Sequence, residues 1–108
     1  MKTKSLDAVT ATGAGLGIMF AKPVTNVTLT VYETGTPTSG VVELQVTQDR
    51  TAPLTWVTVA TYDTSDSSQT AGVPVAYAST AVLGARANCT TQPGGGSSPT
   101  LTAHVVGT

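Results

Sequence analysis

The chain has 108 residues, of which 40% are hydrophobic and 10% are charged, with five Lys and Arg against six Asp and Glu. A domain of this size buries roughly two thirds of its unfolded surface, so the composition favours one folded, soluble domain. The low charge excludes a basic surface for nucleic acid or an anionic membrane, and no apolar run approaches the roughly 18 residues of a membrane span. We therefore expect neither nucleic acid nor membrane as a partner.

The first fifteen residues are rich in small and polar types and predict an N-terminal arm over residues 1–15, ahead of a domain spanning 16–108. Such a segment is poor at building a core but can become ordered on a partner. Lys2 and Lys4 resemble the start of a signal peptide, but no convincing cleavage site follows, so we expect an unprocessed chain. Deleting residues 1–12 should then leave folding intact and abolish partner binding. The residues expected to contact the partner are Lys2, Lys4, Leu6, Val9 and Leu16.

Alternation of apolar and polar residues predicts strands along the rest of the chain. In 24–32 the side chains of Val27, Leu29 and Val31 share one face, as a half-buried strand requires. After a turn rich in Gly and Pro, a second strand places Val42, Leu44 and Val46 inward and Glu43, Gln45 and Thr47 outward. The two strands are expected to form a hairpin. Further strands are predicted in 16–22, 56–62, 73–77, 81–90 and 100–106.

This pattern predicts an all-β fold, a single antiparallel β-sandwich, immunoglobulin-like or jelly-roll-like, of about six to eight short strands. The core should consist mostly of Val and Ala, with Leu29, Leu44, Trp56 and Leu83 as the larger residues. If the indole of Trp56 is buried, its replacement by Ala should cost about 3–5 kcal/mol.

The residues that could carry chemistry are few. Cys89 is expected to be a buried thiol and His104 a surface residue, because neither has a partner in the sequence that would make it a nucleophile or a base. The acids are scattered across separate turns, which does not favour a metal site. Calcium at Asp63 and Asp66 is the one alternative, since loop carboxylates and carbonyls can bind it. We therefore expect no catalytic residue, no cofactor and no metal site, and a protein that is not an enzyme.

Four segments together resemble the small β-sandwich proteins found in the virions of tailed bacteriophages. The pattern is a strand that ends in Ser or Thr before an Asp, a Trp strand, an Arg-containing strand and a final Thr-rich strand. Its segments in this chain are 41–49, 56–59, 83–87 and 100–106. Two departures are Gln48, which separates Thr47 from Asp49, and 50–53, which replaces a Gly-rich turn.

The resemblance implies a non-enzymatic virion structural protein, assembled in the host cytoplasm, that decorates a capsid or forms a minor part of a head or tail. Its partner would be the major capsid protein or another virion protein, and the domain would form a homo-oligomer, with a trimer as the first expectation. The alternatives are a carbohydrate-binding module or tail-fibre-type adhesion domain, which would use exposed aromatic rings, and a hydrolase too diverged to recognise.

Overall fold

The strands make up one antiparallel sheet. The computed structural model describes residues 2–108, apart from the side chain of Thr80, and within them the sheet contains seven strands. These are β1 (Lys2–Val9), β2 (Gly13–Ala14), β3 (Ile18–Thr34), β4 (Ser39–Thr47), β5 (Val57–Asp63), β6 (Val75–Gly94) and β7 (Thr100–Gly107). No described residue lies in a helix that is long and apolar enough to span a membrane. The expected all-β antiparallel fold is confirmed.

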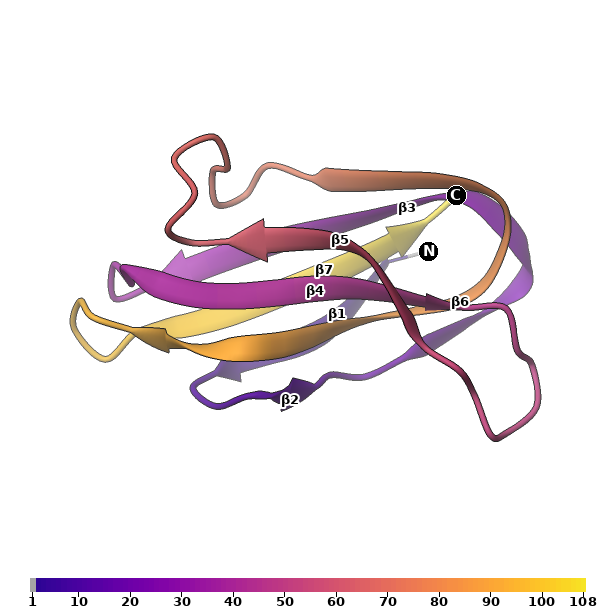
Figure 1. Cartoon of the computed structure of the whole chain (residues 1–108), viewed down its shortest axis with the longest axis horizontal. Helices are drawn as coiled ribbons and strands as arrows, with labels where there is room; N and C mark the ends of the chain where they lie inside the picture. Colours follow the sequence, from indigo (N-terminus) through magenta and orange to yellow (C-terminus); the bar gives the residue numbers. More distant parts are fainter. Residues whose placement is uncertain (1) are drawn as a thin grey trace.

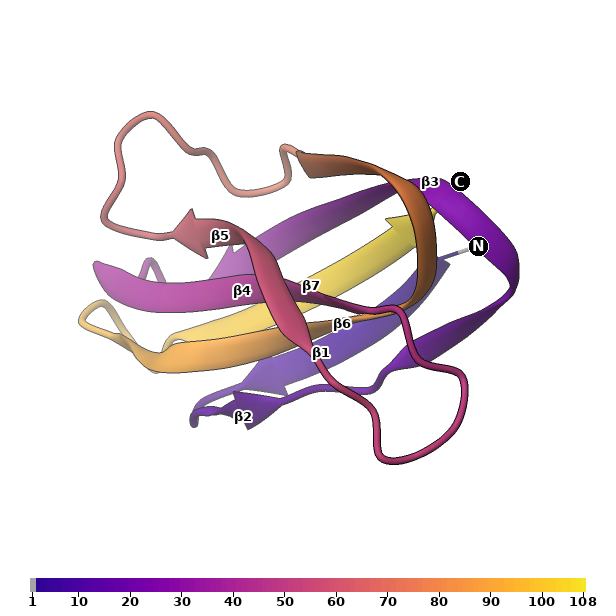
Figure 2. The ribbon, with the colours of Figure 1, turned by 45° about the vertical axis from the view of Figure 1, so that its right-hand side comes forward.

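The sheet is folded over into two layers because its two longest strands each belong to both (Figure 1). The strand order is β1-β7-β3-β6-β4-β5, and β2 pairs with β6. Residues 27–34 of β3 pair with β7, whereas Ile18 and Met19 pair with the middle of β6. The first layer therefore contains β1, β7, the end of β3 and the start of β6. The second contains the start of β3, β2, the end of β6, β4 and β5 (Figure 2).

The strands turn from one layer to the other beside Gly84. The pairing of β3 with β6 jumps from Met19–Gly84 to Val24–Val82, so four residues of β3 stand opposite Leu83 alone. A Cβ at position 84 would lie 2.6 Å from Met19 Sδ and 2.9 Å from a Thr47 methyl carbon. A residue without a side chain therefore lets the strands cross closely at this point.

The bend corrects the expectation that Leu83 fills the core. Val82 and Ala85 are both fully buried, and Leu83 between them is only half-buried. Strict alternation would put residues 83 and 85 on the same face, but β6 bends from one layer to the other opposite the bulge in β3, so its inward residues change from Val82 to Ala85.

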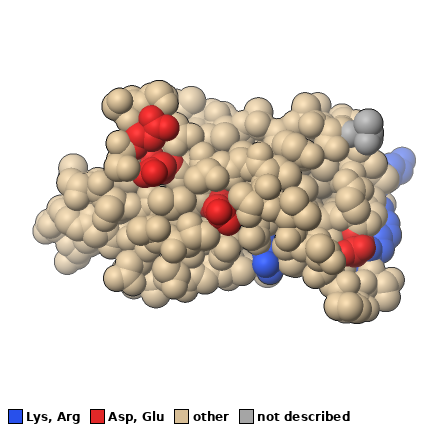
Figure 3. All heavy atoms as spheres, in the orientation of Figure 1, with Lys and Arg blue, Asp and Glu red and all other residues tan. Residues whose placement is uncertain are grey.

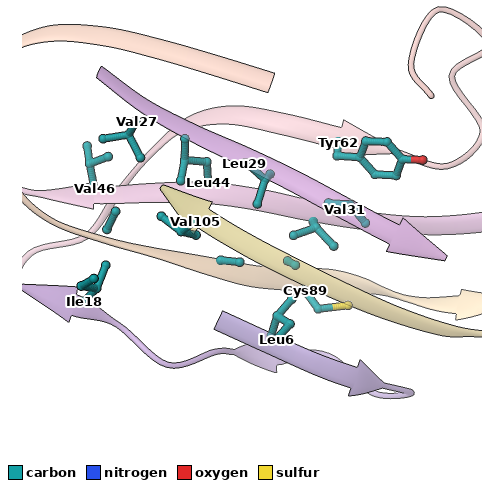
Figure 4. Close-up of a cluster of buried hydrophobic side chains, with 14 of the residues drawn as sticks. Leu6, Ile18, Val27, Leu29, Val31, Leu44, Val46, Tyr62, Cys89 and Val105 are labelled. Atoms are coloured by element: carbon teal, nitrogen blue, oxygen red, sulfur yellow. The ribbon is translucent and has the colours of Figure 1, made fainter. Parts of the chain in front are cut away.

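The core lies between the layers and is built mainly from Val, Leu and Ala (Figure 4). The inward faces expected for β3 and β4 are confirmed, with Leu29, Val42 and Leu44 fully buried. Thr47 is also buried, against expectation, because its hydroxyl accepts the Asp49 backbone N–H at 3.1 Å and its methyl group packs beside Gly84.

The hairpin expected between β3 and β4 is not present. On its two edges β3 pairs with β6 and β7, and β4 pairs with β5 and β6. The connection between β3 and β4 therefore crosses from the first layer to the second. Gly35 lies in this turn with φ +75°, where a Cβ would come within 2.3 Å of the Ser97 carbonyl oxygen.

Residues 2–9 and 13–14 form strands of the sheet, which corrects the expected N-terminal arm. β1 pairs with β7 along its length, and Leu6 is only 3% exposed. The Ser5 hydroxyl donates to the Leu16 carbonyl at 2.7 Å and accepts the Ala87 N–H at 2.8 Å, and the Leu16 N–H donates to the Ser5 carbonyl at 2.8 Å. These bonds join β1 to the segment that follows β2. The strand was missed because its apolar residues do not alternate.

Replacing Leu6 by Ala tests whether β1 belongs to the folding unit. We expect Leu6→Ala to lower the free energy of unfolding by about 2–5 kcal/mol, since the side chain is buried in the core. Lys4→Ala, on the exposed face of the same strand, should change it by less than about 0.5 kcal/mol. Urea denaturation of both variants provides the measurement. An unchanged midpoint for Leu6→Ala would mean that β1 is not part of the cooperative unit.

Candidate interaction site

One margin of the folded sheet is open among the described residues. β5 pairs with β4 alone, and residues 75–82 of β6 pair with β3 alone. The loop 64–74 joins these two strands without bringing them together as a ladder (Figure 1). We call the space between β5 and residues 75–82 the seam.

Two hollows border the seam. The larger is a groove of about 340 Å³, and the smaller has a volume of about 120 Å³. The groove is lined by Val46, Gln48, Asp49, Thr55, Val57, Val59 and Tyr77. The smaller hollow is lined by Tyr62, Ser68, Gln69, Thr70, Val73, Pro74 and Val75. Both hollows therefore combine side chains of β5 or its flanks with a side chain of β6.

The groove is mostly apolar and has one charged group in its wall. Val57 is 55% exposed within it. The half-buried Asp49 accepts the Thr55 N–H through Oδ2 at 2.7 Å, which holds the segment before β5. Across residues 2–108 the structure contains no cation paired with this carboxylate. The groove thus offers aliphatic and aromatic surface with a negative charge at one end.

A glutamine side chain covers the other end of the β5 edge. Gln69 Nε2 donates to the Thr61 carbonyl at 2.8 Å, and Gln69 Oε1 accepts the Asp63 N–H at 2.7 Å. A side-chain amide thereby makes the pair of hydrogen bonds that a neighbouring strand would make. Residues 57–60, which border the groove, have no such cover among the described side chains. The Thr58 hydroxyl bonds instead to the side chains of Glu43 and Gln45 in β4.

A polar cluster joins the layers next to the smaller hollow. The Tyr62 hydroxyl donates to Glu33 Oε2 at 2.7 Å, and the Thr64 hydroxyl donates to the same oxygen at 3.0 Å. Burial of the Tyr62 ring and its hydrogen bond to the Glu33 carboxylate raise the pKa of Tyr62 above its ordinary value. Figure 4 shows this ring at one end of the core.

Trp56 is not the buried core residue expected from the sequence. It is half-buried just before β5, with the Arg86 guanidinium 4.5 Å from its ring centroid and Gly17 beside its edge. Arg86 is held in turn by a 2.8 Å bond from Nε to the Gln45 side-chain oxygen. The indole therefore lies across the outside of the second layer, because the segment before β5 passes over that surface.

The exposed aromatic rings do not gather on one surface. Tyr32 is 43% exposed on the outside of the first layer, where it packs edge-on against His104 at 5.2 Å. Tyr77 faces the groove, whereas Phe20 and Tyr62 belong to the core. No pair of adjacent exposed rings for stacking on a sugar occurs among the described residues.

The cysteine, the histidine and the two loop aspartates singled out in the sequence are packed against, or hydrogen-bonded to, their neighbours in the fold. Cys89 is buried as expected, and burial raises the pKa of its thiol. His104, expected at the surface, is half-buried, and desolvation together with Lys2 and Lys4 lowers its pKa. Asp63 and Asp66 accept hydrogen bonds from Ser65 and Ser68 within their turn. No group of three potential metal ligands occurs among residues 2–108.

Charge is unevenly distributed along the long axis of the molecule. Most basic side chains lie at one end, whereas acidic side chains lie at the opposite end, near the middle and also beside the basic side chains (Figure 3). The basic end carries Lys2, Lys4, Lys22 and Arg50. Glu33, Asp63 and Asp66 lie around the turns after β3 and β5. Asp7 lies at the basic end, where it pairs with Lys4, so the two ends differ only in part in their charge.

The structure separates the five residues predicted to contact a partner. Lys2 and Lys4 are exposed, and Leu16 is 66% exposed. Leu6 is buried and Val9 is half-buried against the core, so these two support the fold. The seam was missed, because an open sheet edge depends on strand order, which residue alternation does not specify.

No family model matches this chain, and a search of curated proteins finds no match. A comparison with solved structures finds the same fold in the SPBc2 prophage-derived protein YomS, with a TM-score of 0.65 and 8% sequence identity. The likeness covers 100% of this chain and 92% of that protein.

The Tyr62–Glu33 contact predicts sensitivity to alkaline pH. Because the folded state holds the Tyr62 proton more tightly, the contribution of this contact is present below the ordinary tyrosine pKa of about 10 and is lost as pH rises above it. Tyr62→Phe should cost about 1 kcal/mol at neutral pH and weaken the fall in stability above pH 10. Denaturation at several pH values measures both effects. Tyr32→Phe is the control and should leave the alkaline fall unchanged; an identical fall in Tyr62→Phe would contradict the assignment.

Replacing Gln69 tests the cover on the β5 edge. In Gln69→Ala the Asp63 amide loses its acceptor, so we expect its hydrogen exchange to accelerate by about tenfold or more. Amides of β7, such as that of Ala103, should keep their exchange rates. Exchange followed by NMR distinguishes the two. Unchanged exchange at Asp63 would mean that Gln69 does not protect this edge.

Proposed function

We propose that this chain is a non-enzymatic structural protein of a phage virion, which decorates the capsid and binds the shell through protein–protein contacts. The observation that carries the proposal is the whole-length likeness in fold to a prophage-derived protein. The resemblance of four sequence segments to small virion sandwiches supports the same origin. The major capsid protein is the proposed partner.

The surface suits repeated association. Charged residues are few, and Thr side chains are frequent on the outer faces of the strands, so a neighbour can cover them at a low desolvation cost. Most of the basic side chains lie at one end, and the acidic turns after β3 and β5 lie at the other, which favours contacts between unlike surfaces of two copies. Such contacts close into rings when the rotation allows it, which supports a cyclic homo-oligomer, with a trimer as the first expectation.

The contacts to the shell are proposed to include Lys2, Lys4 and Leu16. All three are exposed near the β1 margin, and Leu16 is a large apolar side chain open to solvent. Exposed apolar residues beside a few charges are typical of surfaces that bind proteins. Residues of the ordered β1 margin, and not a free arm, are therefore proposed to contact the shell.

A carbohydrate-binding or tail-fibre-type adhesion domain is the competing function. It would require aromatic rings that stack side by side on a sugar, and the described rings are dispersed. We therefore treat glycan binding as an outcome of the test.

Co-sedimentation with assembled phage capsids tests the proposal, with light scattering to measure the oligomeric state. The wild-type protein should sediment with capsids and form a small oligomer. Leu16→Glu should bind at least tenfold more weakly, whereas Asp66→Asn, in an exposed turn, should bind as the wild type does. A glycan-array signal without capsid binding, or turnover of any substrate, would contradict the proposal.

A further inference from the structure

We propose that the seam binds an extended segment of a partner protein, which adds to β5 as a new strand. The segment carries apolar side chains at alternate positions and a basic side chain at the end next to Asp49. This inference goes beyond the proposed function, because it concerns the mode of binding and stands whether or not the partner is a capsid protein.

The two edge strands of the sheet, β1 and β5, differ in how far they are protected from pairing with another chain. β1 carries Lys4 and Asp7 as an ion pair, has two register shifts, and is joined on its outer side to Leu16 through Ser5. Charges, bulges and cover of this kind prevent another chain from pairing with an edge. β5 has one register shift, between Ala60 and Thr58, but it has no charged residue before Asp63 and no Pro. No described side chain bonds to the backbone edge of 57–60, so this edge is left available where it borders the groove.

The contacts of Gln69 indicate that the backbone of β5 can form hydrogen bonds with an added strand. Its side-chain amide donates to the Thr61 carbonyl and accepts from the Asp63 N–H, as the backbone N–H and C=O groups of an added strand would. The hydrogen-bonding groups of β5 at this end thus point into the seam. An extended segment lying along 57–60 would continue the same pairing towards the groove.

The groove supplies side-chain recognition. Val57 and Val59 come from β5 and Tyr77 comes from β6, so apolar surface lines both sides. In strand addition, main-chain hydrogen bonds provide affinity, and surfaces for alternate side chains provide specificity. A segment with aliphatic residues at every second position matches this lining.

The charge of Asp49 favours a segment of a partner protein over a second copy of this chain as the occupant of the groove. The carboxylate lies in the groove wall without a paired cation in the described chain. A second copy of β5 would bring no basic side chain, and its Asp63 would add like charge. A second copy of β1 carries lysines, but this strand is already joined to neighbours on both sides. A segment of another protein with a basic residue can both pair with the backbone of β5 and place a positive charge beside the Asp49 carboxylate.

Synthetic peptides of alternating Val and Thr provide the probe. Two acetylated and amidated six-residue peptides, with Lys at either the first or the last position, are titrated into the isotope-labelled full chain and followed by NMR. At least one should shift the amides of Val57, Val59 and Tyr77 and slow their hydrogen exchange. The same peptide with backbone N-methyl groups at alternate positions should bind at least tenfold more weakly, because it cannot complete the ladder.

Three variants locate the binding. Val57→Lys puts a charge on the open edge at a side chain that is already 55% exposed, and should weaken binding at least tenfold without unfolding the domain. Asp49→Asn should weaken binding of the Lys peptide about threefold or more, and should not affect a peptide with Gln in place of Lys. Leu16→Lys is the matched control, because its side chain is 66% exposed outside the seam, and should bind as the wild type does.

Several results would overturn the inference. Equal binding of the N-methylated peptide, shifts confined to other surfaces, or undiminished binding by Val57→Lys would exclude strand addition at β5. Equal binding of Lys and Gln peptides to the wild type would remove the basic residue from the proposal. A dimer that Val57→Lys dissociates would make the seam an interface between copies. Loss of capsid binding with peptide binding retained would count against the proposed function alone.

Discussion

The crossing of β3 and β6 at Gly84 is the constraint on which the rest of the structure depends. Because a Cβ there would meet Met19 and Thr47, only a residue without a side chain allows the strands to pass this closely. The bulge of β3 opposite Leu83 then turns both strands from one layer into the other. One sheet thereby encloses a core, although its residues are mostly small, and the layers need no disulfide to join them.

The two margins of this folded sheet follow from the same bend. On one side, Ser5 reaches both Leu16 and Ala87, so a single hydroxyl joins β1 to the second layer. On the other side, β5 and the start of β6 do not pair with each other, and Gln69 bonds to the backbone of β5 only at residues 61–63. The groove is therefore a product of how the sheet closes, with Asp49 placed in it by its bond to the Thr55 amide.

The polar side-chain contacts of this protein mostly hold turns and connecting segments in place against the sheet. Glu33 ties the start of the turn after β3 to Tyr62 and Thr64 in the other layer. Arg86 lies between Gln45 and the face of Trp56, which keeps the segment before β5 against the sheet. Because only 10% of the residues are charged, the surface as a whole carries few charges, a condition that favours contact with other proteins.

The sequence by itself determined the fold class and the inward faces of β3 and β4, because period-two alternation records which side of a strand meets the core. It also indicated that Cys89 is buried. Only the tertiary structure decided that residues 2–9 form a strand, that Val82 replaces Leu83 in the core, that β3 and β4 lie in different layers, and that β5 has an open edge. These features depend on bulges and strand order, which arise from contacts between distant segments and leave no local period in the chain.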